Sequence, residues 1–120
     1  MEYALLIYGD LSQADAASPD ETKQMMDEYW KYEAWLAEKG TKRAGEALHP
    51  PTQATTVRVK DGETITTDGP FAETKEQLGG FYLIECANLD EALEAAAKCP
   101  GAWHGSIEVR PVMKFEGAPQ

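Results

Sequence analysis

The sequence predicts an α+β fold, a ferredoxin-like β-α-β-β-α-β two-layer sandwich with an inserted β-hairpin. Three observations support this prediction. Apolar runs at residues 2–8 and 81–86 have the composition of buried strands. Two amphipathic stretches that follow the capping residues Ser18 and Asn88 alternate with the strands. An Asp-Gly pair between two alternating segments marks a hairpin. Strands interleaved with two helices are typical of a sheet that carries both helices on one face.

The first strand, over residues 2–8, is followed by a helix that we expect over 19–39. Ser18 is placed as its N-cap, and Glu21 stands three residues later, as in a capping box. Gly40 has the conformational freedom to end the helix in the left-handed region. The residues that share its apolar face at helical spacing are Met25, Tyr29, Tyr32 and Leu36.

Residues 41–48 predict an irregular strand, which ends at the prolines that follow. Residues 54–60 alternate cleanly, with Val57 and Val59 expected to point inward, and residues 63–67 return antiparallel after the turn.

The strand at 81–86 leads to a short helix over 89–99, which is capped by Asn88. The helix residues expected to face inward are Leu89, Ala92, Leu93 and Ala96. Residues 105–115 form the last strand, with Ile107, Val109 and Val112 on the core side. Two helices cover one face of such a sheet, so we expect a homodimer that covers the other face.

Length and composition predict one domain, residues 1–120. The net charge of −10 argues against nucleic-acid partners and against anionic membrane surfaces. The chain shows neither a signal peptide nor a spanning segment. Cys86 and Cys99 are expected to be buried, reduced thiols of a cytoplasmic protein.

The stretch "DGPFAETKEQLGGFYLIE" resembles the YCII-related family, in its DGPF-domain branch. The segments "LLIYGD", "ATTVRVKDG" and "SIEVRPVM" extend the resemblance over nearly the whole chain. The resemblance implies a dimeric α/β barrel built from ferredoxin-like subunits. Most members of the family are small bacterial cytoplasmic proteins without an established reaction, and some are encoded beside extracytoplasmic-function sigma factors. Related barrels include small-molecule isomerases and monooxygenases.

The chain departs from the family at one position of interest. Shorter YCII-like members carry a histidine in the first helix, paired with an aspartate, as their presumed active dyad. Here Tyr29 or Trp30 stands where that histidine would be, so the dyad is not carried over.

The DGPF loop offers the first candidate site residues. Asp68 either caps the turn through backbone N–H groups or acts as a general base at the mouth of a pocket. Phe71 either anchors the loop on the sheet or contacts a substrate. Glu73 lies near enough to the turn to share a site with Asp68, in which case the two carboxylates would divide acid and base roles.

His104 is the preferred general acid/base of the two histidines, because it lies at a loop-to-strand junction beside Trp103. Tyr8, at the end of the first strand, and Trp30 complete the walls of the predicted pocket. Two separated histidines without a third ligand at fixed spacing predict no metal site.

Two functions follow from these residues. The first is a cofactor-free protein that binds or transforms a small, neutral or apolar molecule by acid/base chemistry in a pocket near the DGPF loop, with lyase-like or isomerase-like reactions as the enzymatic form. The second is a non-catalytic dimeric interaction or regulatory module, in which the loop clasps the partner; the association of such a module with sigma-factor regulation is implied by the family resemblance.

Overall fold

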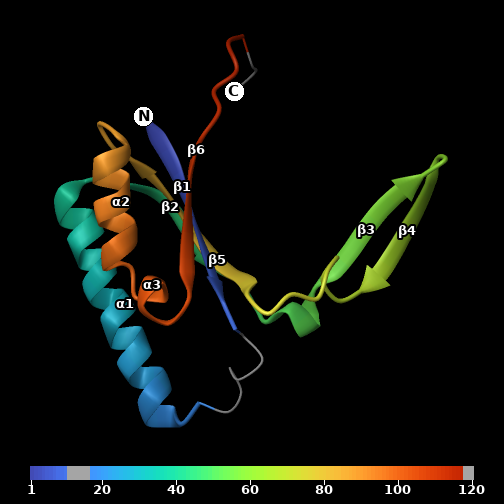
Figure 1. Cartoon of the computed structure of the whole chain (residues 1–120), viewed down its shortest axis with the longest axis horizontal. Helices are drawn as coiled ribbons and strands as arrows, with labels where there is room; N and C mark the ends of the chain where they lie inside the picture. The colour runs from blue at the N-terminus through green and yellow to red at the C-terminus, as the bar shows by residue number, and fades with distance from the viewer. Residues whose placement is uncertain (11–16, 118–120) are drawn as a thin grey trace.

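The computed structural model describes residues 1–10 and 17–117; the loop predicted between the first strand and the first helix lies mostly outside these residues. A four-stranded antiparallel sheet has the order β2-β5-β1-β6. Its strands are β1 (Glu2–Gly9), β2 (Lys42–Ala47), β5 (Gln77–Glu85) and β6 (Ser106–Pro111). The helices α1 (Pro19–Lys39), α2 (Leu89–Lys98) and α3 (Gly101–His104) lie on one side of this sheet (Figure 1). The predicted ferredoxin-like α+β sandwich is therefore confirmed.

Local signals explain the boundaries of both long helices. The Ser18 side chain accepts a hydrogen bond from the backbone N–H of Glu21, and Gly40 ends α1 with a φ of 67°. Asn88 accepts in the same way from the N–H of Glu91 at the start of α2. The predicted caps are thus confirmed. The short helix α3 was not predicted.

Within residues 1–10 and 17–117, the inserted hairpin pairs only with itself. Strand β3 (Thr55–Lys60) runs antiparallel to β4 (Glu63–Asp68). Asp61 and Gly62 have φ values of 51° and 79°, as the predicted type I′ turn requires. Figure 1 shows this hairpin extending away from the four-stranded sheet. Because of this extension the radius of gyration is 16.6 Å. A compact chain of the same length has a radius of gyration of about 14 Å.

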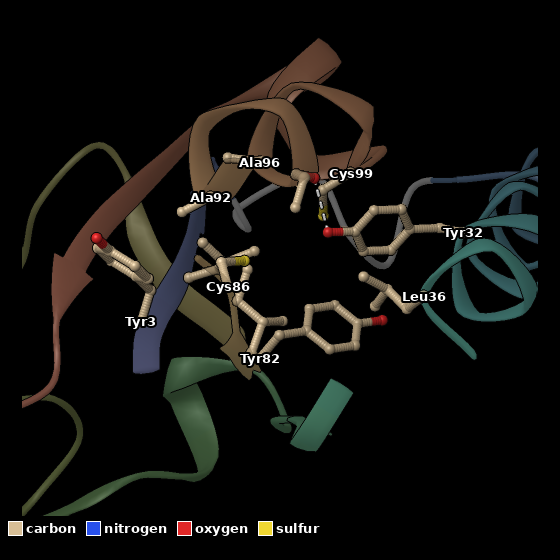
Figure 2. Close-up of a cluster of buried hydrophobic side chains, with 11 residues drawn as sticks. Tyr3, Tyr32, Leu36, Tyr82, Cys86, Ala92, Ala96 and Cys99 are labelled. Carbon is tan, nitrogen blue, oxygen red and sulfur yellow. Dashed lines mark hydrogen bonds between the residues drawn. The ribbon is translucent and has the colours of Figure 1, made fainter. Parts of the chain in front are cut away.

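The core lies between the sheet and the helices. Leu5, Leu36, Ile84 and Cys99 are fully buried there. Figure 2 shows Tyr32 reaching from α1 towards α2, where its hydroxyl donates a hydrogen bond of 2.7 Å to the carbonyl of Ala95. Both cysteines are free and buried, as predicted.

Two details of the predicted core are wrong. Leu89 and Leu93 are 48% and 47% exposed, because α2 turns its small residues to the sheet and buries Ala92, Ala95 and Ala96. Val57 and Val59 do not point into the core of the chain, since they are 58% and 69% exposed on the projecting hairpin.

Candidate functional site

A cavity of about 550 Å³ opens between the N-terminal half of α1, α3 and one end of the sheet. Residues from five strands and helices surround it: the end of β1, the end of β2, the first half of β5 and the face of α1 between Met25 and Glu33, with α3 closing one side. Sites for small organic molecules fall in this size range and lie in concave places between secondary-structure elements. The cavity is therefore the candidate functional site.

Glycines form much of the cavity wall, and four of them, Gly45, Gly80, Gly101 and Gly105, cannot be replaced without displacing a neighbour. A Cβ atom on Gly45 would lie 2.6 Å from the ring of Tyr82. A Cβ atom on Gly101 would lie 2.6 Å from Ile7 and 3.0 Å from the hydroxyl of Tyr29. Distances below 3 Å are steric clashes, so the missing side chains allow the aromatic rings to occupy their positions around the cavity.

Three of the predicted site residues line this cavity: Tyr8, Trp30 and His104. Tyr8 follows a register shift in the β1–β5 pairing, where Ile7 is paired with Gly80 and Tyr8 with Leu78. Bulges of this kind recur beside functional sites, because they redirect a side chain. Trp30 is 63% exposed, and His104 is also exposed, so both lie at the open side.

The other three predicted site residues do not line the cavity. Asp68 is exposed at the end of β4. In the loop that follows, Phe71 is 78% exposed and Glu73 is also exposed. Gly69 in this turn has a positive φ of 95°. Its N–H donates to the carbonyl of Ala54 and its carbonyl accepts from the Thr56 hydroxyl. In the described residues these bonds, rather than the Asp68 carboxylate, hold the turn.

An ion pair beside the cavity was not predicted as part of the site. The Lys42 ammonium donates to both oxygens of Glu33, at 2.9 and 2.7 Å, and the Tyr82 hydroxyl donates to Glu33 Oε1 at 3.4 Å. Glu33 and Tyr82 line the cavity. The Lys42 ammonium also lies 5.5 Å from the centre of the Tyr82 ring, within the range of a cation–π contact.

A second register shift brings Lys42 to this place. In the β2–β5 pairing, Lys42 is opposite Ile84 while Ala44 is opposite Leu83, which leaves Arg43 as an extra residue. Opposed residues share a face of the sheet, and Ile84 faces the helices. Lys42 therefore points towards α1. The sequence carries no sign of this bulge beyond the irregular pattern of residues 41–48.

Two tyrosines, the half-buried Tyr29 and the buried Tyr82, line the cavity and also contact the core. Burial, followed by the nearby Cys99, raises the pKa of Tyr29 well above its usual range. Burial, followed by the Glu33 carboxylate, raises the pKa of Tyr82 in the same way. Both phenols hence stay protonated near neutral pH and can donate hydrogen bonds.

Residues 1–10 and 17–117 hold neither a metal-ligand cluster nor a helix suited to crossing a membrane. No group of three or more histidine, cysteine or acidic residues is placed to hold a metal ion there. Within the same residues, none of the helices combines the length and the apolar character that a membrane crossing requires.

Comparison with known proteins agrees with the resemblance in the sequence. The family model of the YCII-related domain matches residues 1–116. An uncharacterized protein of Rhizobium meliloti (strain 1021) is 46% identical over 118 residues, which are 97% of this chain and 95% of that protein. On the extent of the family match and the identity to this relative, the chain belongs to the YCII-related domain family.

Proposed function

We propose that this YCII-related protein binds a small organic molecule in the cavity and transforms it without a cofactor by acid/base chemistry. The observation that carries the proposal is the cavity of about 550 Å³, whose wall combines glycines and aromatic rings with a few polar groups. Mostly apolar pockets with a small number of convergent polar groups are typical of small-molecule sites.

His104 is the proposed general acid/base, and Tyr8 and Trp30 are the proposed substrate-binding residues. All three line the cavity, and histidine is the side chain that most readily exchanges protons near neutral pH. The net charge of −10 does not attract anions, so the substrate is proposed to be neutral. The two free, buried cysteines support a reducing, cytoplasmic location.

A thermal-shift screen of neutral metabolites tests the binding, because a ligand that binds only the native state raises the melting temperature. For a hit that is turned over, His104→Gln is expected to lower kcat by about 100-fold or more. His49→Gln is the matched control, since His49 is exposed and does not line the cavity. Equal activity of both variants would remove His104 from the mechanism, and a screen without any hit would contradict the proposed function.

A second candidate function, a dimeric interaction module, is supported by two exposed features. The face of the sheet opposite the helices carries Leu6 and Leu83, which remain half exposed. Phe71 in the DGPF loop is 78% exposed. A homodimer that packs two such faces together, as in a dimeric α/β barrel, would cover the first, and a loop that clasps the partner would cover the second.

Sedimentation of two charge variants tests the dimer. Leu83→Glu places a carboxylate on the uncovered face and is expected to give a monomer. Leu93→Glu is the control, because Leu93 is 47% exposed on α2, on the other side of the sheet. A wild-type protein that sediments as a monomer would contradict the dimer.

The role of the DGPF loop is tested by Asp68→Ala in the same assay. Dissociation of this variant supports the clasp. Loss of turnover in an intact dimer instead supports a catalytic role for Asp68, with Glu73 as its neighbour and Phe71 as a substrate contact.

A further inference from the structure

We infer that Glu33, held by Lys42 and Tyr82, is the polar anchor of the cavity and that it binds the hydroxyl group of a neutral aromatic molecule, a phenol or a naphthol. This inference rests on the proposed small-molecule function and names the class of ligand.

Glu33 is the acidic residue most enclosed by the cavity wall. The side chain of Glu33 is 27% exposed. Asp10 and Glu46, the other acidic residues at the cavity, are both exposed. Glu46 is also opposite Phe81 in the β2–β5 pairing, and therefore faces away from the helices. A ligand that enters the cavity therefore meets the Glu33 carboxylate in the enclosed part of the cavity.

The partners of Glu33 determine the charge of the ligand. Lys42 contacts both carboxylate oxygens, at 2.9 and 2.7 Å, so the pair has no net charge. A cationic ligand would have to compete with Lys42, and an anionic ligand would be repelled by Glu33. A neutral ligand avoids both costs.

The remaining hydrogen-bonding capacity determines the polar group of the ligand. A carboxylate offers about four acceptor positions, and Lys42 and Tyr82 occupy three in this structure. The Tyr82–Glu33 distance of 3.4 Å is long for an O–H···O hydrogen bond, so it is readily exchanged. A hydroxyl group can replace it, since one hydroxyl both donates to Glu33 and accepts from Tyr82.

The walls on either side determine the shape of the ligand. Tyr29 and Trp30 from α1 line one side of the cavity, and the Tyr82 ring, which lies against Gly45, lines another. Figure 2 shows the Tyr82 ring extending from β5 towards α1. Trp30 is 63% exposed, which leaves an indole face open to a stacking partner. A flat aromatic ring fits between such walls and gains from offset stacking.

Titration calorimetry with three probes of one shape tests the inference: 2-naphthol, 2-methoxynaphthalene and 2-naphthoate. Wild type is expected to bind 2-naphthol about tenfold or more tightly than 2-methoxynaphthalene, because only the former donates a hydrogen bond to a charged acceptor. It is expected to bind 2-naphthoate more weakly than either.

Glu33→Gln is expected to abolish most of the preference for 2-naphthol while 2-methoxynaphthalene binds as before. Glu28→Gln is the matched control on the same helix, because Glu28 pairs with Lys31 and does not line the cavity. It is expected to keep the wild-type preference.

The outcomes separate this inference from the proposed function. Equal binding of 2-naphthol and 2-methoxynaphthalene to wild type, or an unchanged preference in Glu33→Gln, would overturn the role of Glu33 and leave a functional cavity. Absence of binding by all three probes would overturn the ligand class, and the metabolite screen then decides the proposed function independently.

Discussion

The two ends of the interface between helices and sheet differ in how they are filled. At the closed end, where α2 covers the sheet, Tyr3, Ile84 and Cys86 pack against small helix residues such as Ala92, and each of the four is less than a tenth exposed. At the cavity end, where α1 and α3 meet the sheet, several wall positions are glycines and a cavity of about 550 Å³ remains.

One end of the sheet therefore supports a closely packed core, and the other end forms a wall of the cavity. Short alanine side chains let α2 approach closely and fill the closed end, whereas absent side chains at the cavity end leave room that aromatic rings only partly occupy. Close packing supplies stability, and incomplete packing leaves space for a ligand at the expense of some of that stability. The stability of the chain should hence depend mainly on the closed end.

The largest expected contrast comes from removing one large side chain from the buried core and one from the cavity wall. Leu36→Ala removes a fully buried side chain and is expected to lower the free energy of unfolding by about 2–5 kcal/mol. Met26→Ala removes one that lines the cavity and is 46% exposed, with an expected loss below about 1 kcal/mol. Guanidinium denaturation measures both. Equal losses would show that the buried core and the cavity wall do not differ.

Adding a methyl group at the cavity end sharpens the comparison. Gly45→Ala forces the ring of Tyr82 to move, and the expected loss of unfolding free energy is about 1–3 kcal/mol. Gly9→Ala is the control at the same cavity, because no atom lies within 4 Å of its added Cβ, and we expect a change within about 0.5 kcal/mol. An unchanged free energy of unfolding in Gly45→Ala would show that the position of the Tyr82 ring does not depend on this glycine.

A smaller effect is expected from alkaline pH, through the tyrosines between the two ends. Burial, then the neighbouring Cys99, raises the pKa of Tyr32 far above its usual range, and Tyr29 and Tyr82 are shifted in the same direction. Above the ordinary tyrosine pKa of about 10 the unfolded chain loses these protons first, so stability is complete below that pH and falls as pH rises.

For Tyr32 the expected slope reaches about 1.4 kcal/mol per pH unit above about pH 10. Tyr32→Phe removes the hydrogen bond to Ala95, so the variant is expected to be less stable than wild type at neutral pH. It also removes the titrating phenol, so its free energy of unfolding is expected to fall less than that of wild type as the pH rises. Urea unfolding at a series of pH values measures both slopes. If the free energy of unfolding fell with pH at the same rate in wild type and in Tyr32→Phe, the result would contradict a contribution of Tyr32 to the alkaline loss of stability.

Features that depend on a few neighbouring residues were predictable from the sequence. The caps at Ser18 and Asn88, the stop at Gly40 and the turn at Asp61 follow from side chains within three or four positions of each helix end or strand end. The order of these elements was enough to predict the ferredoxin-like arrangement, because few topologies place two helices on one face of such a sheet.

The site was predictable only in part. Tyr8, Trp30 and His104 come from three distant parts of the chain and line one cavity. The DGPF loop was expected beside them, but Asp68 lies at the base of the hairpin β3–β4, opposite Thr55, and does not line the cavity. The direction in which a hairpin leaves a sheet depends on the residues at its base, and hydrophobic periodicity does not report it.

The sequence by itself determined which segments form the two long helices and the six strands, where the two long helices begin, and that the chain is a YCII-related domain. Only the tertiary structure decided that Glu33 meets Lys42 and Tyr82, because a bulge at Arg43 turns Lys42 towards α1. It also decided that Ala92, rather than Leu93, faces the sheet. Both outcomes depend on how closely two elements approach, which is a balance of side-chain volumes across the whole interface and belongs to no single stretch of sequence.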